Sequence, residues 1–347
     1  MTPLDALKTA YQAAFGAEHL LRDPSAARKW LHEELSACPA SPDTPLFEAL
    51  SPDTQWVHLA AWKAAGLPEE WLAEAFVRSC VPRQAGEARF LRALQQIDTL
   101  ADAGETPFSA AAWQAEKQAY LSHGLRPVHH SERFRDAEHP AYRVVDHRYA
   151  RVLALLAACP RTERPIVALD GRCASGKSTL AEDAAEIAGA GIVHMDDFFL
   201  PPALRTPERL AAPGGNVHHE RFAREVLPAL RQGGPFRYTR FDCSRMALAD
   251  AREVGQAPLI LVEGAYSCHP ALGDYMDLRV FSDVEPDLQM ARIRARNGEA
   301  GAENFRTRWI PMEEAYFSAF SIREKADLIL SAQASPSGDT FVRPPRR

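Results

Sequence analysis

Residues 171–179, GRCASGKST, decide how the second half of this 347-residue chain folds. They fit the pattern G-x-x-x-x-G-K-[ST], with Lys177 and Ser178 after the second glycine. An apolar segment, PIVALD, precedes them and a helical pattern, STLAEDAAEIAG, follows. Because glycine allows a tight turn, the amides of such a loop and of the next helix can face phosphate oxygens. The stretch therefore predicts a phosphate-binding loop.

The candidate nucleotide-binding residues are Gly171, Ala174, Ser175, Gly176, Lys177, Ser178 and Thr179. In loops of this type the lysine reaches the β- and γ-phosphates and the next hydroxyl ligates Mg²⁺, so the pattern predicts binding of ATP and Mg²⁺. Cys173 lies inside the loop, near Lys177 and a helix start. Because both features stabilise a thiolate, we expect Cys173 to have a lowered pKa and to react faster than the other five cysteines.

From residue 165 on, short apolar segments alternate with helical patterns. The apolar segments are IVALD, GIVHM, PLILVEG, LRVFSDV and ADLIL, and the helical ones include STLAEDAAEIAGA, HERFAREVLPALRQG and EPDLQMARIRARN. Such alternation is typical of a parallel sheet covered by helices on both faces. The predicted fold class is therefore α/β, a P-loop NTPase three-layer fold whose ligands bind at the carboxyl ends of the strands.

The first part of the chain has a different pattern. Residues 1–130 read as one helix after another, with helix starts expected at Asp23-Pro24 and at Ser51-Pro52. The predicted organisation is an all-α domain over 1–130, a connecting segment over 131–162 with a helix at about 141–158, a P-loop domain over 163–332 and a tail over 333–347. The all-α domain carries no motif that predicts chemistry, and its histidines, which include His19, His129 and His130, lack partners at the spacing of a metal site.

The composition argues against several classes of protein. A formal net charge of −6 gives no general attraction to nucleic acids or anionic membranes. No apolar run approaches the roughly 20 residues that span a bilayer, and the first residues lack the features of a signal peptide. The six cysteines form no C-x-x-C pair and are typical of free thiols. We expect a cytoplasmic protein that acts on a small molecule, with its oligomeric state left open.

Acidic residues follow two of the predicted strands. Asp196 and Asp197 come after GIVHM, and Glu263 ends PLILVE. A carboxylate at the carboxyl end of a strand can accept the proton of a hydroxyl group or help to hold Mg²⁺. Because side chains alternate along a strand, we expect only one of the two aspartates to face the phosphates. The chain has no N-K-x-D motif, which argues against a GTPase.

Taken in order, the segments of the second half resemble one branch of P-loop kinases. They are DGRCASGKST, HMDDFF, PGGNVHHERFAREVL, YTRFDC, LILVEGAYS, DLRVFSDV, RIRARNG, WIPMEEAYF and ADLIL. This series, over about residues 163–332, is similar to the branch that contains uridine kinase, phosphoribulokinase and bacterial pantothenate kinase. The resemblance implies an ATP- and Mg²⁺-dependent kinase that phosphorylates a hydroxyl group of a small metabolite.

The resemblance also implies roles for individual residues. Asp196, the first of the pair, matches the catalytic base, and the candidate metal ligands are Ser178, Glu263 and Asp196. RIRARNG resembles the lid helix, with Arg292 and Arg296 in the best register and Arg294 as an alternative. An acidic residue often follows the last arginine in the family, whereas Asn297 stands there in this chain. The candidate catalytic residues are Asp196, Lys177, Arg292 and Arg296.

The segment YTRFDCSR matches the region that, in the family, supplies an aromatic wall and polar contacts to the acceptor. The candidate substrate-binding residues are Tyr238, Phe241, Asp242, Arg245 and His218. His218 stands where uridine kinases usually carry an aspartate that holds ribose hydroxyls. A nucleoside is the first hypothesis for the acceptor, followed by a pantothenate-like compound or a sugar phosphate.

A function of another class is also open: the P-loop domain could bind ATP as a sensor and switch the interactions of the helical domain. Asp196 and the lid arginines favour the enzyme. A sensor needs neither a general base nor groups that neutralise a transferring phosphoryl group.

Overall fold

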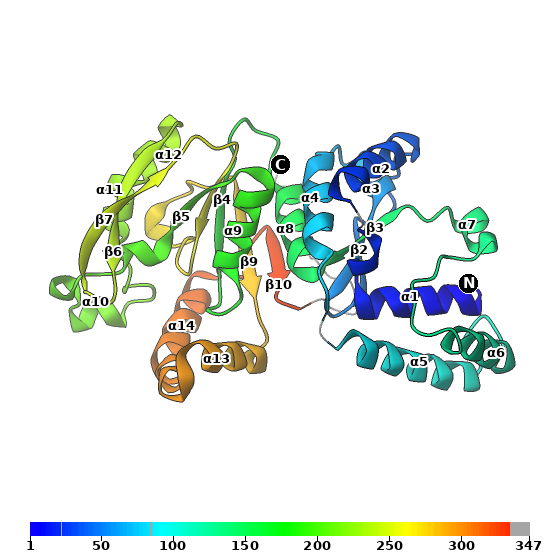
Figure 1. Cartoon of the computed structure of the whole chain (residues 1–347). Coiled ribbons are helices and arrows are strands. Elements are labelled where there is room, and N and C mark those ends of the chain that lie inside the picture. The colour runs from blue at the N-terminus through cyan, green and yellow to red at the C-terminus, as the bar shows by residue number, and fades with distance from the viewer. Residues whose placement is uncertain (22, 84, 334–347) are drawn as a thin grey trace. The chain divides into compact units, whose positions relative to one another are not determined.

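The computed structural model describes residues 1–21, 23–83 and 85–333 (Figure 1). The chain divides into two compact units, with Met1–Leu153 in the first and Ala154–Ala332 in the second. The division falls inside helix α8 (His147–Ala158), in the part of the sequence predicted to connect two domains. No helix among the described residues is long and apolar enough to cross a membrane.

The second unit is built on a five-stranded parallel sheet with the strand order β10-β9-β4-β8-β5. Its strands are β4 (Ile166–Gly171), β5 (Gly191–His194), β8 (Ile260–Glu263), β9 (Leu278–Asp283) and β10 (Leu328–Ser331). The flanking helices are α9 (Lys177–Ala188), α10 (Pro207–Ala211), α11 (His219–Glu225), α12 (Leu227–Gln232), α13 (Pro286–Asn304) and α14 (Ile310–Phe320). The predicted α/β fold of the P-loop class is confirmed.

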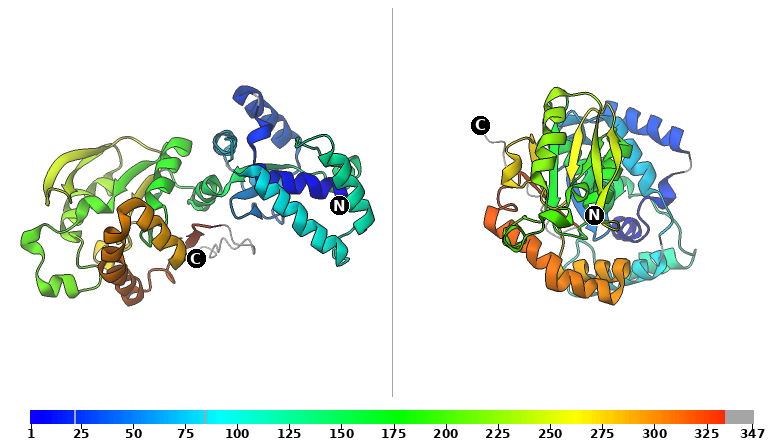
Figure 2. Two further views of the ribbon diagram at one scale, coloured as in Figure 1. Left: turned by 60° about the horizontal axis from the view of Figure 1, so that its bottom comes forward. Right: turned by 90° about the vertical axis from the view of Figure 1, so that its left-hand side faces the viewer.

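Short elements complete this unit. The hairpin of β6 (Phe236–Asp242) and β7 (Ala247–Val254) lies beside β5, at the opposite end of the sheet from β10 (Figure 1). A π-helical turn, Phe305–Trp309, joins α13 to α14, and the two helices adjoin along one side of the unit (Figure 2). The 3-10 turns are η2 (Met195–Phe198), η3 (Pro202–Leu204) and η4 (Pro270–Leu272).

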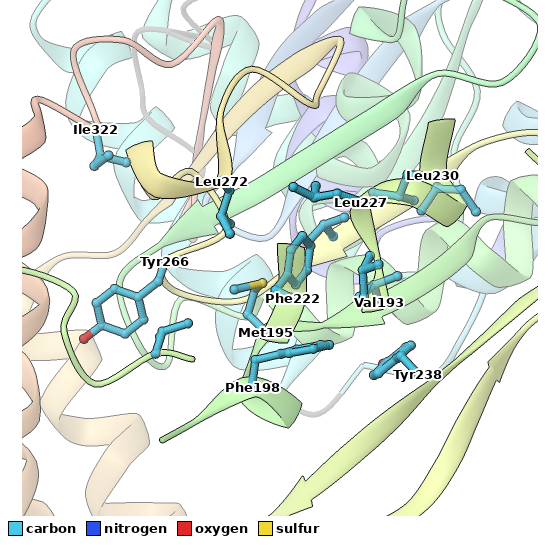
Figure 3. Close-up of a cluster of buried hydrophobic side chains, with 14 of the residues drawn as sticks. Val193, Met195, Phe198, Phe222, Leu227, Leu230, Tyr238, Tyr266, Leu272 and Ile322 are labelled. Atoms are coloured by element: carbon cyan, nitrogen blue, oxygen red, sulfur yellow. The ribbon is translucent and has the colours of Figure 1, made fainter. Parts of the chain in front are cut away.

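The core of this unit explains why its strands read as continuous apolar runs. In β4 the three residues Val167, Ala168 and Leu169 are completely buried, as expected for a parallel strand covered on both faces. Figure 3 shows another part of the core, where side chains of β5, η2, α11, α12 and β6 meet. Phe198 of η2 packs edge-on against Phe222 of α11, with 5.0 Å between ring centroids.

One fully buried carboxylate joins several of these elements. Asp170, near the end of β4, accepts hydrogen bonds from the amides of Gly171 (2.7 Å), Tyr266 (3.2 Å) and Cys268 (2.9 Å). It also accepts one from the hydroxyl of Tyr316 on α14 (2.8 Å). Burial raises the pKa of Asp170, and the donors oppose this effect because they stabilise its charged form. The carboxylate therefore ties β4 to the segment after β8 and to α14.

The first unit is mostly helical, but it is not the all-α domain that was predicted, because it also contains strands. Its helices are α1 (Pro3–Phe15), α2 (Pro24–Ala37), α3 (Leu59–Ala64), α4 (Glu69–Ser79), α5 (Gly86–Asp102), α6 (Ala110–Leu121) and α7 (Glu132–Glu138), with a 3-10 turn η1 (Glu18–Leu20). The helix start at Asp23-Pro24 is confirmed, since the Asp23 side chain accepts hydrogen bonds from the amides of Ser25 and Ala26. A small antiparallel sheet, β1 (Phe47–Ser51), β2 (Thr54–His58) and β3 (Tyr142–Asp146), adds to the helices.

This sheet overturns two predicted helix boundaries. Ser51-Pro52 does not begin a helix: Ser51 ends β1 and Thr54 begins β2, with their hydroxyls 2.7 Å apart across the turn. The helix expected at about 141–158 begins only at His147. The residues before it form β3, where Val144 and Val145 are buried opposite β2. The pairing of β3 with β2, which lie far apart in the chain, leaves no local periodicity to detect.

We predict that Asp170→Asn lowers the free energy of unfolding of the second unit by about 1–3 kcal/mol, because at least one buried amide loses its acceptor. Tyr316→Phe removes one hydrogen bond and should cost about 0.5–1.5 kcal/mol. Urea unfolding, with hydrogen exchange of the β4 amides as the local reporter, measures both. Asp274→Asn is the matched control, since the Asp274 side chain is 90% exposed. Equal effects of Asp170→Asn and Asp274→Asn would contradict the role of Asp170.

Candidate functional site

The predicted phosphate loop joins the end of β4 to the start of α9, and its backbone explains both glycines of the motif. Gly171 has φ +131°, and a Cβ there would lie 2.1 Å from the carbonyl oxygen of Ser282 on β9. Gly176, the residue before α9, has φ +88°. Gly171 has no room for a side chain, and at both positions a side chain would be strained by the positive φ. Ala174 also adopts a positive φ, +58°.

Lys177 and Ser178 lie in the first turn of α9. The Lys177 ammonium group donates to the carbonyl oxygens of Gly171 and Arg172, both at 2.8 Å, so it lies over the loop. The Ser178 hydroxyl donates to the carboxylate of Glu263, with oxygen–oxygen distances of 3.2 and 3.3 Å. The structure thus brings together the lysine, the hydroxyl and the acidic strand end, while the side chain of Thr179 is exposed and Ser175 is buried.

One more residue, His194, belongs to this group, and the sequence analysis did not select it. His194 ends β5, directly opposite Glu263 in the sheet register. Its Nδ1 lies 2.6 Å from Oε1 of Glu263, whose carboxylate is only 4% exposed. The signal in the sequence was the position of His194 at a strand end, but only the pairing of β5 with β8 shows that it meets Glu263.

Asp196 and Asp197 lie in the 3-10 turn η2 rather than on the strand, so the argument from strand alternation was wrong, although the two carboxylates do separate. Asp197 is 4% exposed, forms an ion pair with Arg252 (2.6 Å) and accepts a hydrogen bond from Tyr238 (3.0 Å). Asp196 is exposed. The protein around it nevertheless desolvates its carboxyl group, and this effect and the negative charge of Glu263 raise the pKa of Asp196.

The metal ligands predicted from the sequence supply the hard oxygen donors that Mg²⁺ prefers. Within the described parts of the chain, no group of three or more His, Cys, Asp or Glu side chains is arranged to hold a metal ion. Mg²⁺ in phosphoryl-transfer sites commonly keeps several waters and uses one or two protein ligands together with phosphate oxygens. Ser178 and Glu263, which already lie in contact, fit that requirement.

The residues of the predicted acceptor region do not form one open surface. Tyr238 and Phe241 are 2% and 3% exposed and pack in the core. Asp242 accepts hydrogen bonds from the amide (2.9 Å) and hydroxyl (2.6 Å) of Ser244, which fixes the turn between β6 and β7. Arg245 in that turn is exposed, and half-buried His218 precedes α11.

Cys243 is a residue near Asp196 that the sequence analysis missed. It lies in the turn between β6 and β7 and is exposed. Partial burial and the negative charge of Asp196, followed by those of Asp242 and Asp197, raise its pKa, while Arg205 opposes them. These electrostatic effects place the turn close to Asp196 although 47 residues separate the two in the sequence (243 − 196). No local pattern indicates such proximity.

The predicted lid helix touches the loop through Arg292. Its guanidinium group donates to the carbonyl of Ala174 (3.0 Å), and Gln289, one turn earlier on α13, donates to that of Cys173 (3.0 Å). Arg296 instead bonds to Asn297 (2.9 Å) and is exposed, as is Arg294. Of the three arginines, the structure brings only Arg292 to the loop.

Helix α14 holds the other side of the loop through two glutamates. Glu313, 8% exposed, accepts a hydrogen bond from the amide of Cys173 (2.9 Å). Arg172 pairs with Glu314 (2.8 Å) and with Asp283 at the end of β9. Glu313 and Glu314 lie in the segment WIPMEEAYF, and no pattern in the sequence indicates that they contact the loop.

The expectation for Cys173 was wrong. Burial, followed by the nearby carboxylate of Glu313, raises the pKa of its thiol to about 12. Lys177 and Gln289 oppose this with smaller effects. A helix start lowers a thiol pKa, whereas burial in apolar surroundings raises it. In this loop, desolvation and a neighbouring negative charge have the larger effect.

We therefore predict that iodoacetamide at pH 8 labels Cys243 well before Cys173. Exposure of Cys243 gives the reagent access, whereas a thiol with a pKa of about 12 holds very little thiolate at this pH. Peptide mapping by mass spectrometry over time measures both rates. Faster labelling of Cys173 would contradict the environment described for the loop.

Comparisons with known proteins give a fold likeness only. No protein-family model matches the chain, and no curated protein matches it. Among solved structures, a proposed uridine kinase from Bacillus stearothermophilus is similar at 18% identity, over 52% of this chain and 97% of that one, with a TM-score of 0.42. A proposed fructose transport system kinase from Silicibacter sp. TM1040 is similar at 27% identity, over 49% of this chain and 93% of that one, with a TM-score of 0.40. At these TM-scores neither likeness assigns a function.

Proposed function

We propose that this protein is an ATP- and Mg²⁺-dependent kinase that transfers the γ-phosphoryl group to a hydroxyl group of a small metabolite. The observation that carries the proposal is the gathering of Lys177, Ser178, Glu263 and Asp196 around the phosphate loop. The last of these has no part in binding phosphate, and a base beside the loop is what an acceptor hydroxyl requires. A nucleoside is the first candidate acceptor, followed by a pantothenate-like compound or a sugar phosphate.

Binding of the nucleotide would rest on the loop and on α9. The amides at the start of α9 offer donors to the phosphates, and Lys177 would exchange its two loop carbonyls for phosphate oxygens or share its three protons among them. Ser178 and Glu263 would hold Mg²⁺, which neutralises charge on the phosphate oxygens when bound. Arg292, which already donates to the loop, would be the lid arginine that adds positive charge there.

Proton transfer would rest on Asp196. Desolvation and the negative charge of Glu263 raise its pKa, which makes the carboxylate a stronger base than an ordinary aspartate. Its exposure leaves it accessible to an acceptor that enters from solvent. Cys243, in the turn close to Asp196, would lie beside that acceptor. We further propose that the acceptor is a free metabolite rather than a nucleic acid or a membrane component, and that the protein works in the cytoplasm, where ATP is made and used.

The experiment that tests the proposal is a screen of metabolite pools for acceptor-dependent release of ADP by the full chain with MgATP. We expect at least one pool to raise ADP release above the rate with ATP alone, and fractionation of that pool to identify the acceptor. Tight binding of ATP with no stimulation by any pool would instead favour the sensor.

The pair Asp196 and Asp197 supplies a matched test of the base. We predict that Asp196→Asn lowers kcat by about 10²–10⁴-fold with little change in ATP affinity, the usual contribution of a general base. Asp197→Asn should lose far less kcat but melt at a lower temperature, because it weakens the buried contacts with Arg252 and Tyr238. In the unsubstituted protein kcat should fall at acid pH, as Asp196 takes up a proton. A larger kcat loss in Asp197→Asn would exclude Asp196 as the base.

Lys177→Ala is predicted to abolish productive use of ATP while the protein still folds, since the lysine positions the phosphates and stabilises their charge. Acceptor-dependent ADP release and thermal melting measure the two properties. Lys325→Ala, which changes an exposed lysine of the same unit, is the control and should keep full activity. Near-normal turnover of folded Lys177→Ala would remove the assignment of the phosphate loop.

A further inference from the structure

The carboxylate of Glu263 is the point at which the start of α9 meets the strand ends β8 and β5. It is buried, and a buried carboxylate needs hydrogen-bond donors. Within the described residues two side chains supply them. The Ser178 hydroxyl lies 3.3 Å from Oε1 and 3.2 Å from Oε2, whereas Nδ1 of His194 lies 2.6 Å from Oε1. The histidine therefore makes the shorter contact.

The two donors differ in how firmly they can hold the carboxylate. The Ser178 hydroxyl has a single proton, and the two oxygens of Glu263 lie at nearly equal distances from it. An ionised carboxylate only accepts hydrogen bonds, so Nδ1 of His194 carries a proton and donates it to Oε1. A hydrogen bond to a charged acceptor is short and strong. The imidazole thus holds Oε1 and leaves Oε2 to the side of Ser178.

The backbone of His194 is itself held in place. In the parallel register of β5 and β8 it lies directly opposite Glu263, so the two side chains leave the sheet on the same face. The two strand ends approach closely, since a Cβ on Gly264 would lie 2.9 Å from Cβ of Met195. The His194 amide also donates to the hydroxyl of Tyr238 on β6 (3.1 Å). The imidazole therefore reaches Glu263 from a backbone that two neighbouring elements position.

The ring of His194 has no other hydrogen-bonding task within the described residues. Its Nε2 bonds to none of them and is not closed off from solvent. The side chain as a whole is 22% exposed, against 5% for that of Glu263. One edge of the ring thus meets the buried carboxylate and the other meets water. The contact with Glu263 is the polar interaction that accounts for a histidine at this strand end.

We propose that His194 is a positioning residue that orients the carboxylate of Glu263 toward Mg²⁺. The inference rests on the proposed function, in which Ser178 and Glu263 hold the ion. The terminal torsion of a glutamate side chain has no sharp preference, so a carboxylate bound only to a shared hydroxyl can turn. With Oε1 bound to the imidazole, Oε2 stays beside the Ser178 hydroxyl. Partners that orient a metal ligand in this way typically contribute about 10–100-fold to metal affinity or activity.

Binding of Mn²⁺, a paramagnetic substitute for Mg²⁺, to the full chain saturated with ADP tests this role without an acceptor. Electron paramagnetic resonance measures the free Mn²⁺. We expect His194→Ala to weaken Mn²⁺ binding by about 10–100-fold. His194→Asn should keep most of the affinity, because its amide nitrogen is as many bonds from Cα as Nδ1 of histidine. His58→Ala is the matched control, since His58 is half-buried and pairs with Glu48 in the first unit.

The outcomes separate the positioning role from the proposed function. Loss of Mn²⁺ affinity in His194→Ala with recovery in His194→Asn supports the role. Unchanged binding in folded His194→Ala, or equal losses in the two variants, would overturn it and leave the kinase proposal intact. If ADP brings no Mn²⁺ to the unsubstituted protein, the proposed function fails and the positioning role fails with it.

The tautomer of His194 covers the case in which His194→Ala does not fold. It is read by NMR on protein labelled with ¹⁵N-histidine, at about pH 9, where a free imidazole is neutral. The signals of His194 are those missing from His194→Asn, and they should show the proton on Nδ1. A proton on Nε2 would overturn the proposal, because Nδ1 could then not donate to Glu263.

Discussion

The buried carboxylate of Asp170 is the interaction on which the second unit depends. Its four donors come from the end of β4, from the segment after β8 and from α14. A buried carboxylate is tolerable only when its hydrogen-bonding capacity is used, so these segments must meet at one point. The phosphate loop begins at the next residue, Gly171, which lies against the backbone of β9. The position of the loop therefore follows from how Asp170 is satisfied.

From that fixed start, the loop is held on two sides by helices that follow it by more than a hundred residues. Arg292 and Gln289 of α13 hold its carbonyl groups, and Glu313 of α14 holds the amide of Cys173. Arg172 adds ion pairs with Glu314 and Asp283. In the proposed kinase, a loop whose backbone groups are positioned in this way would need little rearrangement to bind phosphates, so that less binding energy would be spent on ordering it.

The first unit solves a related problem in a similar way. Asp5 is buried and, like Asp170, has its carboxylate satisfied by several donors, here from Thr2 and Ser131. His130 also lies beside Asp5, although no spacing in the sequence relates the two residues. The helical pattern of α1 indicated that Leu7, Ala10 and Tyr11 face a core, but not that a lysine is buried with them.

The sequence by itself determined the elements whose signals are local. The glycines at 171 and 176, the apolar runs of the parallel strands and the Asp23-Pro24 helix start predict their structures because backbone conformation and side-chain periodicity depend on neighbouring residues. Only the tertiary structure decided what depends on segments distant in sequence. Pairing of β5 with β8 brings His194 to Glu263, burial and then the carboxylate of Glu313 raise the pKa of Cys173, and β3 replaces the start of a predicted helix. Desolvation and strand pairing are set by which segments meet, and no local pattern encodes that.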